Sequence, residues 1–417
     1  MNMSKLIRNT SRYLIGLLFL FSGFTKAVDP MGSKFKFDDY FVAFGMEWLI
    51  PLPLVLGIIL STIEFSIGFC LISNLYSKIC SIIALIFMLF FTGLTFILAL
   101  TDPVTDCGCF GDAVVLTNWQ TFFKNLIFLV PTIIIFIERK KFVGRFNNGG
   151  QIALISLILI TIVSISIYSL NNLPIVDYRP YRVGQNLLLN SKEHPNGAPS
   201  AEFETTLIYR KDSVEKTFDL NNLPDSTWEW VETNNKLVKE GYVPPVSNFS
   251  LTDEYGMDNT STLLNRNEMV LMANVLDLSK LTQDEIERYN EISVQCLSND
   301  IYFAMLTSTD QGFIEDYKNQ YLPIYKIFTV DPITLKTIVR SDGGFMLTYK
   351  GTVLKKWHRD KFPDVLSLNE YLMIKEAQQS GSPRPMQLTA FYLLIFLSIA
   401  LLFELFGLNL KSREKQK

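Results

Sequence analysis

Two cysteines stand one residue apart in the stretch DCGCFGD, where Cys107 and Cys109 flank Gly108. Glycine supplies the backbone freedom that a disulfide between such close neighbours needs. A bond between them would close almost no loop, so it would add little stability. A small, strained ring is also easier to reduce than a relaxed one. The spacing therefore indicates thiol–disulfide exchange, in which the pair accepts electrons from a substrate dithiol or donates them.

The surroundings of the pair leave two other interpretations open. The cysteines form an inert disulfide or stay as free thiols, or they bind a metal together with the carboxylates of Asp106 and Asp112. The chain has only two histidines, which argues against a histidine-supported zinc site, and we expect no metal. Asp106 and Asp112 would raise the thiol pKa values, whereas Lys124 or a helix beginning near Thr117 would offset them.

Glu64 lies well inside a very apolar segment, LSTIEFSIGF. A carboxylate at such a position is costly, and it usually faces the interior of a helix bundle or a polar path. It serves either as a proton relay or quinone contact, or as a protonated or hydrogen-bonded structural group. Ser22 and Lys26, on the preceding apolar segment, are its expected polar neighbours, with Lys26 nearer the outer surface.

The other three cysteines favour a packing role. We expect Cys70 and Cys80 near the cytoplasmic ends of two spans, as small apolar residues of a bundle. About 27 residues of mostly helical chain separate Cys80 from Cys107, roughly 40 Å at 1.5 Å per residue, which excludes a direct relay. Cys296 lies on a predicted amphipathic helix and is expected to be buried. A mixed disulfide between Cys296 and the outer pair is the alternative.

Six apolar segments are long enough to cross a bilayer as helices. They cover residues 13–28, 49–73, 79–101, 119–137, 151–170 and 387–408. The short segments on one side hold 12 Lys and Arg, and those on the other side hold four. The positive-inside rule then predicts two cytoplasmic termini, with the cysteine loop and residues 171–386 outside. Alternatively, the first 27 residues are a cleaved signal peptide.

Composition divides the chain into regions. The formal net charge is −3, and no part is basic enough to suggest nucleic acid as a partner. A bundle of four membrane helices is expected over residues 1–145. The remaining regions are a fifth membrane helix at 146–170, a β-rich extension at 171–242, an α/β domain at 243–370, a sixth membrane helix at 387–408 and a tail at 409–417.

The motifs of the first two spans and of the cysteine loop resemble the DoxX and MauE (methylamine utilisation protein) group of bacterial four-helix membrane proteins. The matching pieces over residues 8–140 are Arg12, LIGLLFLFSGFTKAVDP, EFSIGFCLI and DCGCFGD. MauE proteins are associated with maturation of a disulfide-rich periplasmic dehydrogenase, and DoxX relatives with quinone-linked sulfur oxidation. The resemblance implies thiol redox at a bacterial inner membrane. Cys107 and Cys109 would be the redox pair and Glu64 a proton or quinone contact, supported by Arg12, Ser22, Lys26, Asp106, Gly108 and Asp112.

Residues 243–365 resemble a membrane-anchored thioredoxin-like domain. The matching pieces are PVSNFSLTDEYG and GGFMLTYKGTVLKKW, within a predicted order of strand, helix, strand, helix and hairpin. Thioredoxin-like enzymes carry Cys-x-x-Cys after the first central strand and a cis-proline before the final hairpin. Here those positions read NVLDLSKL and Ser341-Asp342-Gly343-Gly344. The domain is therefore expected to bind or scaffold.

The predicted fold class is an α-helical membrane protein, with a DoxX/MauE-like four-helix bundle, two further spans and an extracytoplasmic α/β thioredoxin-like domain. The predicted function is thiol–disulfide redox, or maturation of extracytoplasmic proteins, through the Cys-Gly-Cys pair. The alternative is a non-enzymatic envelope scaffold or chaperone, so enzyme activity stays open. No cofactor motif is evident, and quinone is the cofactor left open. The expected partners are the lipid bilayer and a thiol-containing client or thioredoxin-like protein.

Overall fold

The computed structural model describes most of the chain. The described residues are 3–104, 106–142, 147–192, 202–211, 214–219, 222–225, 227–239, 244, 246, 249–368 and 385–414. The expected boundaries at 145/146 and 242/243 lie outside them.

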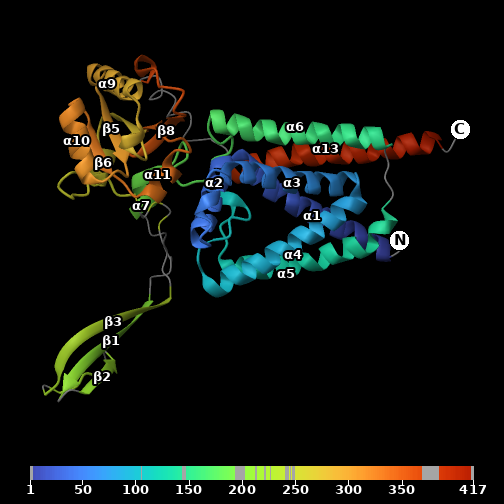
Figure 1. Cartoon of the computed structure of the whole chain (residues 1–417), viewed down its shortest axis with the longest axis horizontal. Coiled ribbons are helices and arrows are strands. Elements are labelled where there is room, and N and C mark those ends of the chain that lie inside the picture. Colours follow the sequence, from blue (N-terminus) through green and yellow to red (C-terminus); the bar gives the residue numbers. More distant parts are fainter. Residues whose placement is uncertain are drawn as a thin grey trace.

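Long helices form one end of the molecule (Figure 1). They are α1 (Met3–Val28), α3 (Pro53–Ser73), α4 (Ser77–Thr101), α5 (Asn118–Ile137), α6 (Asn148–Asn171) and α13 (Pro385–Glu414). Among the described residues, five helices are long and apolar enough to cross a membrane, and α1 together with α2 makes a sixth candidate. The observed helices overlap all six predicted spans. The helical, membrane-type class of this region is thereby confirmed.

Helix α2 (Pro30–Ala43) turns away from α1 by 96°. The turn follows from local chemistry, because Asp29 caps α2 by accepting a hydrogen bond from the Gly32 amide and Pro30 occupies its first turn. In Figure 1, α2 crosses the end of the bundle opposite the two termini. It therefore packs across the ends of α1 and α3.

Helices α1 and α3 approach each other closely through glycines. A Cβ atom at Gly23 would lie 2.3 Å from the Phe65 amide nitrogen, and one at Gly68 would lie 2.3 Å from that of Leu20. Gly16 faces α3 in the same way. Small residues allow such contact between membrane helices. This accounts for the glycines in the motifs of both spans.

A five-stranded mixed sheet forms the core of the second region. Its strands are β4 (Met269–Asn274), β5 (Ile301–Thr307), β6 (Lys326–Thr329), β7 (Gly344–Tyr349) and β8 (Thr352–Trp357), in the order β6-β5-β4-β7-β8. Strands β4, β5 and β6 run parallel, and β7 is antiparallel to both β4 and β8. Helices α9 (Gln283–Ser298), α10 (Gln311–Tyr321) and α11 (Pro332–Ile338) connect them. The sequence order missed β6 and α11, which are short.

A separate sheet lies apart from this domain in Figure 1. It contains β1 (Glu202–Lys211), β2 (Val214–Asp219) and β3 (Glu229–Lys239), in the order β2-β1-β3. The β1–β2 hairpin was predicted, but its proposed turn at Lys211-Asp212 lies partly outside the described residues. The remaining short elements are α7 (Leu187–Lys192), α8 (Thr260–Leu264), η1 (Glu47–Leu49), η2 (Gly111–Ala113), η3 (Glu138–Lys141), η4 (Leu278–Lys280) and η5 (Val365–Ser367).

Candidate functional site

The loop between α4 and α5 brings the two neighbouring cysteines into contact. The Sγ atoms of Cys107 and Cys109 lie 2.9 Å apart, and both residues are free thiols. Gly108 between them has φ +66°, a conformation that glycine adopts without strain. The Tyr40 hydroxyl donates a hydrogen bond to the Cys107 carbonyl, and the Ser22 hydroxyl lies 2.7 Å from the Cys109 carbonyl oxygen. The loop is thus held between α2 and α1.

A buried ion pair lies beside the loop. The Lys26 ammonium is 2.9 Å from Oε1 and 2.7 Å from Oε2 of Glu64, and both side chains are buried. The Ser22 hydroxyl is also 2.9 Å from Glu64 Oε2. Ser22 and Lys26 were predicted as the polar neighbours of Glu64, and the structure places both within hydrogen-bond distance of its carboxylate. Three of the predicted site residues therefore form one network.

The two acidic residues that flank the cysteines form ion pairs with basic side chains. Asp106 accepts a hydrogen bond from the Gly108 amide and pairs with Lys36 at 2.5 Å. Asp112 pairs with Arg340, also at 2.5 Å. The described residues contain no group of three or more side chains that could hold a metal ion. The arrangement thus gives no support to a metal site built from the two thiols and these two carboxylates.

The two thiols have different pKa values. The pKa of Cys109 is lowered to about 6, first by the hydrogen bond with the Cys107 thiol and then, against burial, by Lys124 and Lys26. The same hydrogen bond, together with burial, raises the pKa of Cys107. Lys124, which was expected to offset the flanking carboxylates, is among the groups that lower the pKa of Cys109. A lowered pKa favours the thiolate form of Cys109 at neutral pH.

An apolar cavity of about 430 Å³ opens beside the thiols. Its walls come from α1 to α5 and the cysteine loop, and they consist mostly of Phe, Leu and Ile side chains. Its polar groups include Ser22, Lys26, Glu64, Lys124 and Asn125. Lining residues such as Ile59 and Phe90 are 48% and 63% exposed on the apolar outer surface of the helices. The cavity therefore suits a molecule that enters from lipid.

Arg340 of the mixed-sheet domain joins that domain to the cysteine loop. Its Nε lies 3.0 Å from Asp29 Oδ2, one of its terminal nitrogens lies 2.5 Å from Asp112 Oδ2, and another donates to the Lys336 carbonyl. The Arg340 side chain is buried. Sequence reasoning missed Arg340, because it follows α11 and lies 228 positions beyond Asp112. The one sequence feature that pointed to Arg340 is its position directly before Ser341-Asp342-Gly343-Gly344, the segment compared above with the loop before the final hairpin of thioredoxin-like enzymes.

Some predicted residues do not join the site. Arg12 stacks on Tyr13 within α1, and ten helical residues separate it from Ser22, about 15 Å along the axis. The thiols of Cys70 and Cys80 interact with each other across the turn between α3 and α4. Cys296 is fully buried on α9, as expected, and burial raises its pKa to about 12. Cys296 is therefore poorly suited to thiol exchange.

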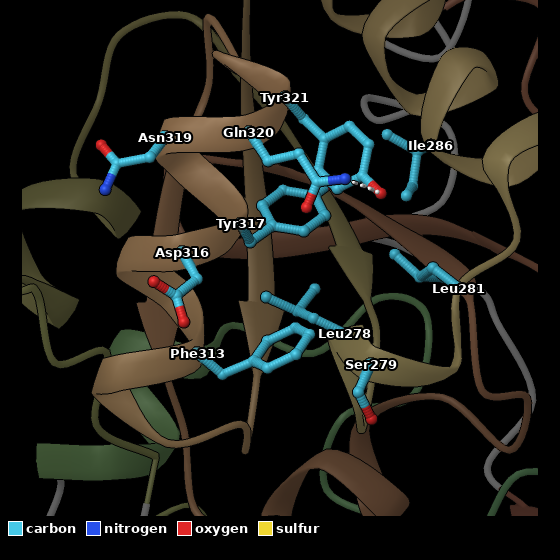
Figure 2. A pocket seen from close by; sticks show the side chains of 10 residues that line it. All are labelled: Leu278, Ser279, Leu281, Ile286, Phe313, Asp316, Tyr317, Asn319, Gln320 and Tyr321. Atoms are coloured by element: carbon cyan, nitrogen blue, oxygen red, sulfur yellow. Dashed lines mark hydrogen bonds between the residues drawn. The ribbon is translucent and has the colours of Figure 1, made fainter.

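The mixed-sheet domain has a second hollow, of about 610 Å³. In Figure 2, Phe313 and Tyr317 extend from α10 toward Leu278, whereas Asp316 and Asn319 point away. This groove adjoins the segment after β4, where a thioredoxin-like enzyme would carry its cysteines. Its lining residues include no cysteine, and the described residues contain no cis peptide bond. The lining of the groove therefore offers no thiol chemistry.

The helical bundle and the cysteine loop define a membrane-type protein with a dithiol at one end. In agreement with this, residues 4–138 match the family described as Methylamine utilisation protein MauE. Residues 203–240, which contain most of the three-stranded sheet, match a family described as a domain of unknown function (DUF8463). No curated protein and no solved structure matches the chain. The MauE match covers the region for which the sequence motifs predicted it.

Proposed function

We propose that this protein is a membrane thiol–disulfide oxidoreductase that uses Cys107 and Cys109 to oxidise an extracytoplasmic client and passes the electrons to a quinone. One observation carries the proposal: the two thiols lie 2.9 Å apart beside an apolar cavity within the helical bundle. A water-soluble electron acceptor has no need of such a cavity. A lipid-soluble one requires it.

Client oxidation begins with a disulfide between Cys107 and Cys109. A client thiolate attacks one of the two sulfurs, the bond between the cysteines breaks, and the other cysteine leaves as a thiolate. The second client thiolate then attacks the client sulfur of this mixed disulfide and releases the first cysteine. The client has gained a disulfide and lost two electrons and two protons. The cysteine pair has become a dithiol.

The residues around the cavity fit a quinone. Apolar side chains would hold its ring and tail, and the Lys124 ammonium would supply a hydrogen-bond donor for a carbonyl oxygen. A quinone bound there would accept two electrons and two protons and leave as a hydroquinone. The Lys26–Glu64 pair lies beside the thiols and offers a carboxylate that can relay a proton.

The mixed-sheet domain would hold the client. We infer a thioredoxin-like domain without catalytic cysteines. This is supported by β4 and β5 joined through α9, and by the closing β7–β8 hairpin. The groove beside η4 is the candidate client surface. Arg340 holds this domain at the end of the bundle that carries the cysteine loop.

The predicted location is a bacterial inner membrane with cytoplasmic termini and a periplasmic domain. Positive charge at the ends of the chain supports this orientation. In Figure 1 the mixed-sheet domain and the cysteine loop lie at one end of the bundle and the termini at the other. The two features that the topology places outside are therefore on one side.

The test is client oxidation by the purified full chain in liposomes, with a reduced dithiol peptide and a short-chain quinone as probes. The Cys107→Ser/Cys109→Ser variant should fold normally and lose oxidation of the peptide. A Cys70→Ser/Cys80→Ser variant is the matched control and should retain it. Peptide oxidation that persists in the Cys107→Ser/Cys109→Ser variant would contradict the proposal. In cells, the Cys107–Cys109 disulfide should become reduced when respiration is blocked.

A scaffold or chaperone is the second candidate, and the groove in the mixed-sheet domain favours it. A scaffold needs no electron acceptor, so the state of Cys107 and Cys109 would not respond to respiration. Alkylation of free thiols in cells, with and without respiration, therefore separates the two functions by the redox state of Cys107 and Cys109.

A further inference from the structure

The basic side chains near the cysteine loop differ in whether a carboxylate neutralises them. Most are neutralised by a carboxylate, in the pairs Lys26–Glu64, Lys36–Asp106 and Arg340 with Asp29 and Asp112. Within the part of the chain that the structure describes, Lys124 lines the cavity without a carboxylate partner. It is thus the uncompensated charge of the cavity wall.

Lys124 lies next to the thiols in space. Its ammonium is above the Phe110 ring, 4.3 Å from the centroid, and Phe110 directly follows Cys109. Lys124 is on the second turn of α5, whose start is fixed by a capping box of Thr117 and Gln120. The position of this cation is therefore set by the same loop that carries the thiols.

An unpaired cation in an apolar cavity favours an anion beside it, because water screens the charge poorly there. Of the neighbouring groups, the Cys109 thiol can supply that anion when it ionises. The charged or titratable groups around Cys109 are Cys107 on its own loop, Lys26 on α1, Lys36 and Tyr40 on α2, Glu64 on α3, Lys124 on α5, and Asp106 and Asp112 on the loop.

We propose that Lys124 is the electrostatic partner of the Cys109 thiolate, so that Cys109 is the leaving sulfur of the pair and Cys107 the sulfur that a client attacks. The backbone contacts of the two cysteines differ. The Cys107 carbonyl accepts a hydrogen bond from Tyr40 on α2, at the end of the bundle, and the Cys109 carbonyl lies against Ser22 beside the Lys26–Glu64 pair. Cys107 is buried and Cys109 half-buried, so a client reaches Cys107 when the loop opens away from α2. The role in turnover rests on the proposed function.

The exchange then has a fixed direction. The client thiolate attacks Cys107 Sγ, the sulfur–sulfur bond breaks, and Cys109 Sγ takes the electron pair as a thiolate beside Lys124. A thiol with a lower pKa leaves faster in such an exchange. The second client thiolate then releases Cys107, which takes up a proton. The reduced pair faces the cavity with Cys109 as its nucleophile.

The experiment measures the reaction of Cys109 with iodoacetamide in the reduced, full-length protein between pH 4.5 and 9. Mass spectrometry of the Cys109 peptide gives the rate at each pH. The wild-type rate should be half-maximal near pH 6, where the thiol ionises. Lys124→Gln should move this midpoint upward by about one pH unit or more. Lys124→Arg should restore it, because the charge is retained.

Lys141→Gln is the matched control, since Lys141 pairs with Glu138 near the far end of the same helical segment. Its midpoint should equal that of the wild type. Protection of the buried Cys70 and Cys80 reports whether the bundle of each variant is folded. An unchanged midpoint in Lys124→Gln overturns the inference, as does an equal shift in Lys124→Arg. This outcome is independent of client oxidation, so the inference and the proposed function can fail separately.

Discussion

The cysteine loop and the mixed-sheet domain hold their cysteines in opposite ways. Cys107 and Cys109 contact each other beside a network of charges and a cavity. Cys296 is alone in the core of the mixed-sheet domain, where burial raises its pKa to about 12. Reactivity follows the groups around a thiol and its access: the Cys107 thiol, Lys124 and Lys26 act on Cys109, whereas Cys296 lies in a hydrophobic core.

This difference assigns the two regions different tasks. The bundle supplies the two thiols, and the Cys107 hydrogen bond together with nearby cations lowers the pKa of Cys109. The mixed-sheet domain supplies a groove and the Arg340 contact to the loop. Three tests of this division follow, from the largest expected effect to the smallest.

The largest effect is expected from Lys26→Met, which leaves Glu64 as an unpaired buried charge. Removing one partner of a buried pair typically costs about 3–5 kcal/mol of unfolding free energy. Thermal unfolding in detergent should show the loss, and Lys26→Met/Glu64→Leu should recover most of it. Lys34→Met is the matched control, because its partner Asp38 lies on the more exposed α2. Equal stability of Lys26→Met and wild type would mean that the pair does not hold the bundle together.

A smaller effect is expected from Arg340→Gln, which removes the contact between the two regions. Asp29 and Asp112 would lose their partner, at a cost of about 1–3 kcal/mol. The cysteine loop should then open more often, and alkylation of Cys107 at fixed pH should accelerate severalfold. Arg359→Gln is the control, since the Arg359–Glu285 pair is a surface pair of the same domain. If both variants react alike, Arg340 does not hold the loop.

The smallest effect is expected from the two capping boxes, one in each region. Thr282→Ala removes the cap of α9, which costs about 1 kcal/mol and should speed alkylation of Cys296 about fivefold. The rates of Cys107 and Cys109 should not change. Thr117→Ala removes the cap of α5. It should speed alkylation of Cys107 and Cys109 and leave the rate of Cys296 unchanged. Coupled changes at both sites would show that the regions open as one unit.

Much of the fold was predictable, because its main signals are local. Apolar length predicted the membrane-type helices, and Thr282 with Glu285 marks the start of α9 through its capping chemistry. Strand β6 escaped prediction because four residues give too little pattern. The side of the membrane and the identity of a client remain predictions.

The sequence by itself placed Cys107 and Cys109 within reach of each other, because only one residue separates them. It also determined that Glu64 needs a polar partner, since an isolated charge is too costly in an apolar helix. The tertiary structure alone decided which partners meet. Lys26 reaches Glu64 across 38 positions, and Arg340 reaches Asp112 across 228. Such pairs depend on how helices and loops fold back on one another, and no local sequence pattern predicts which distant residues will meet.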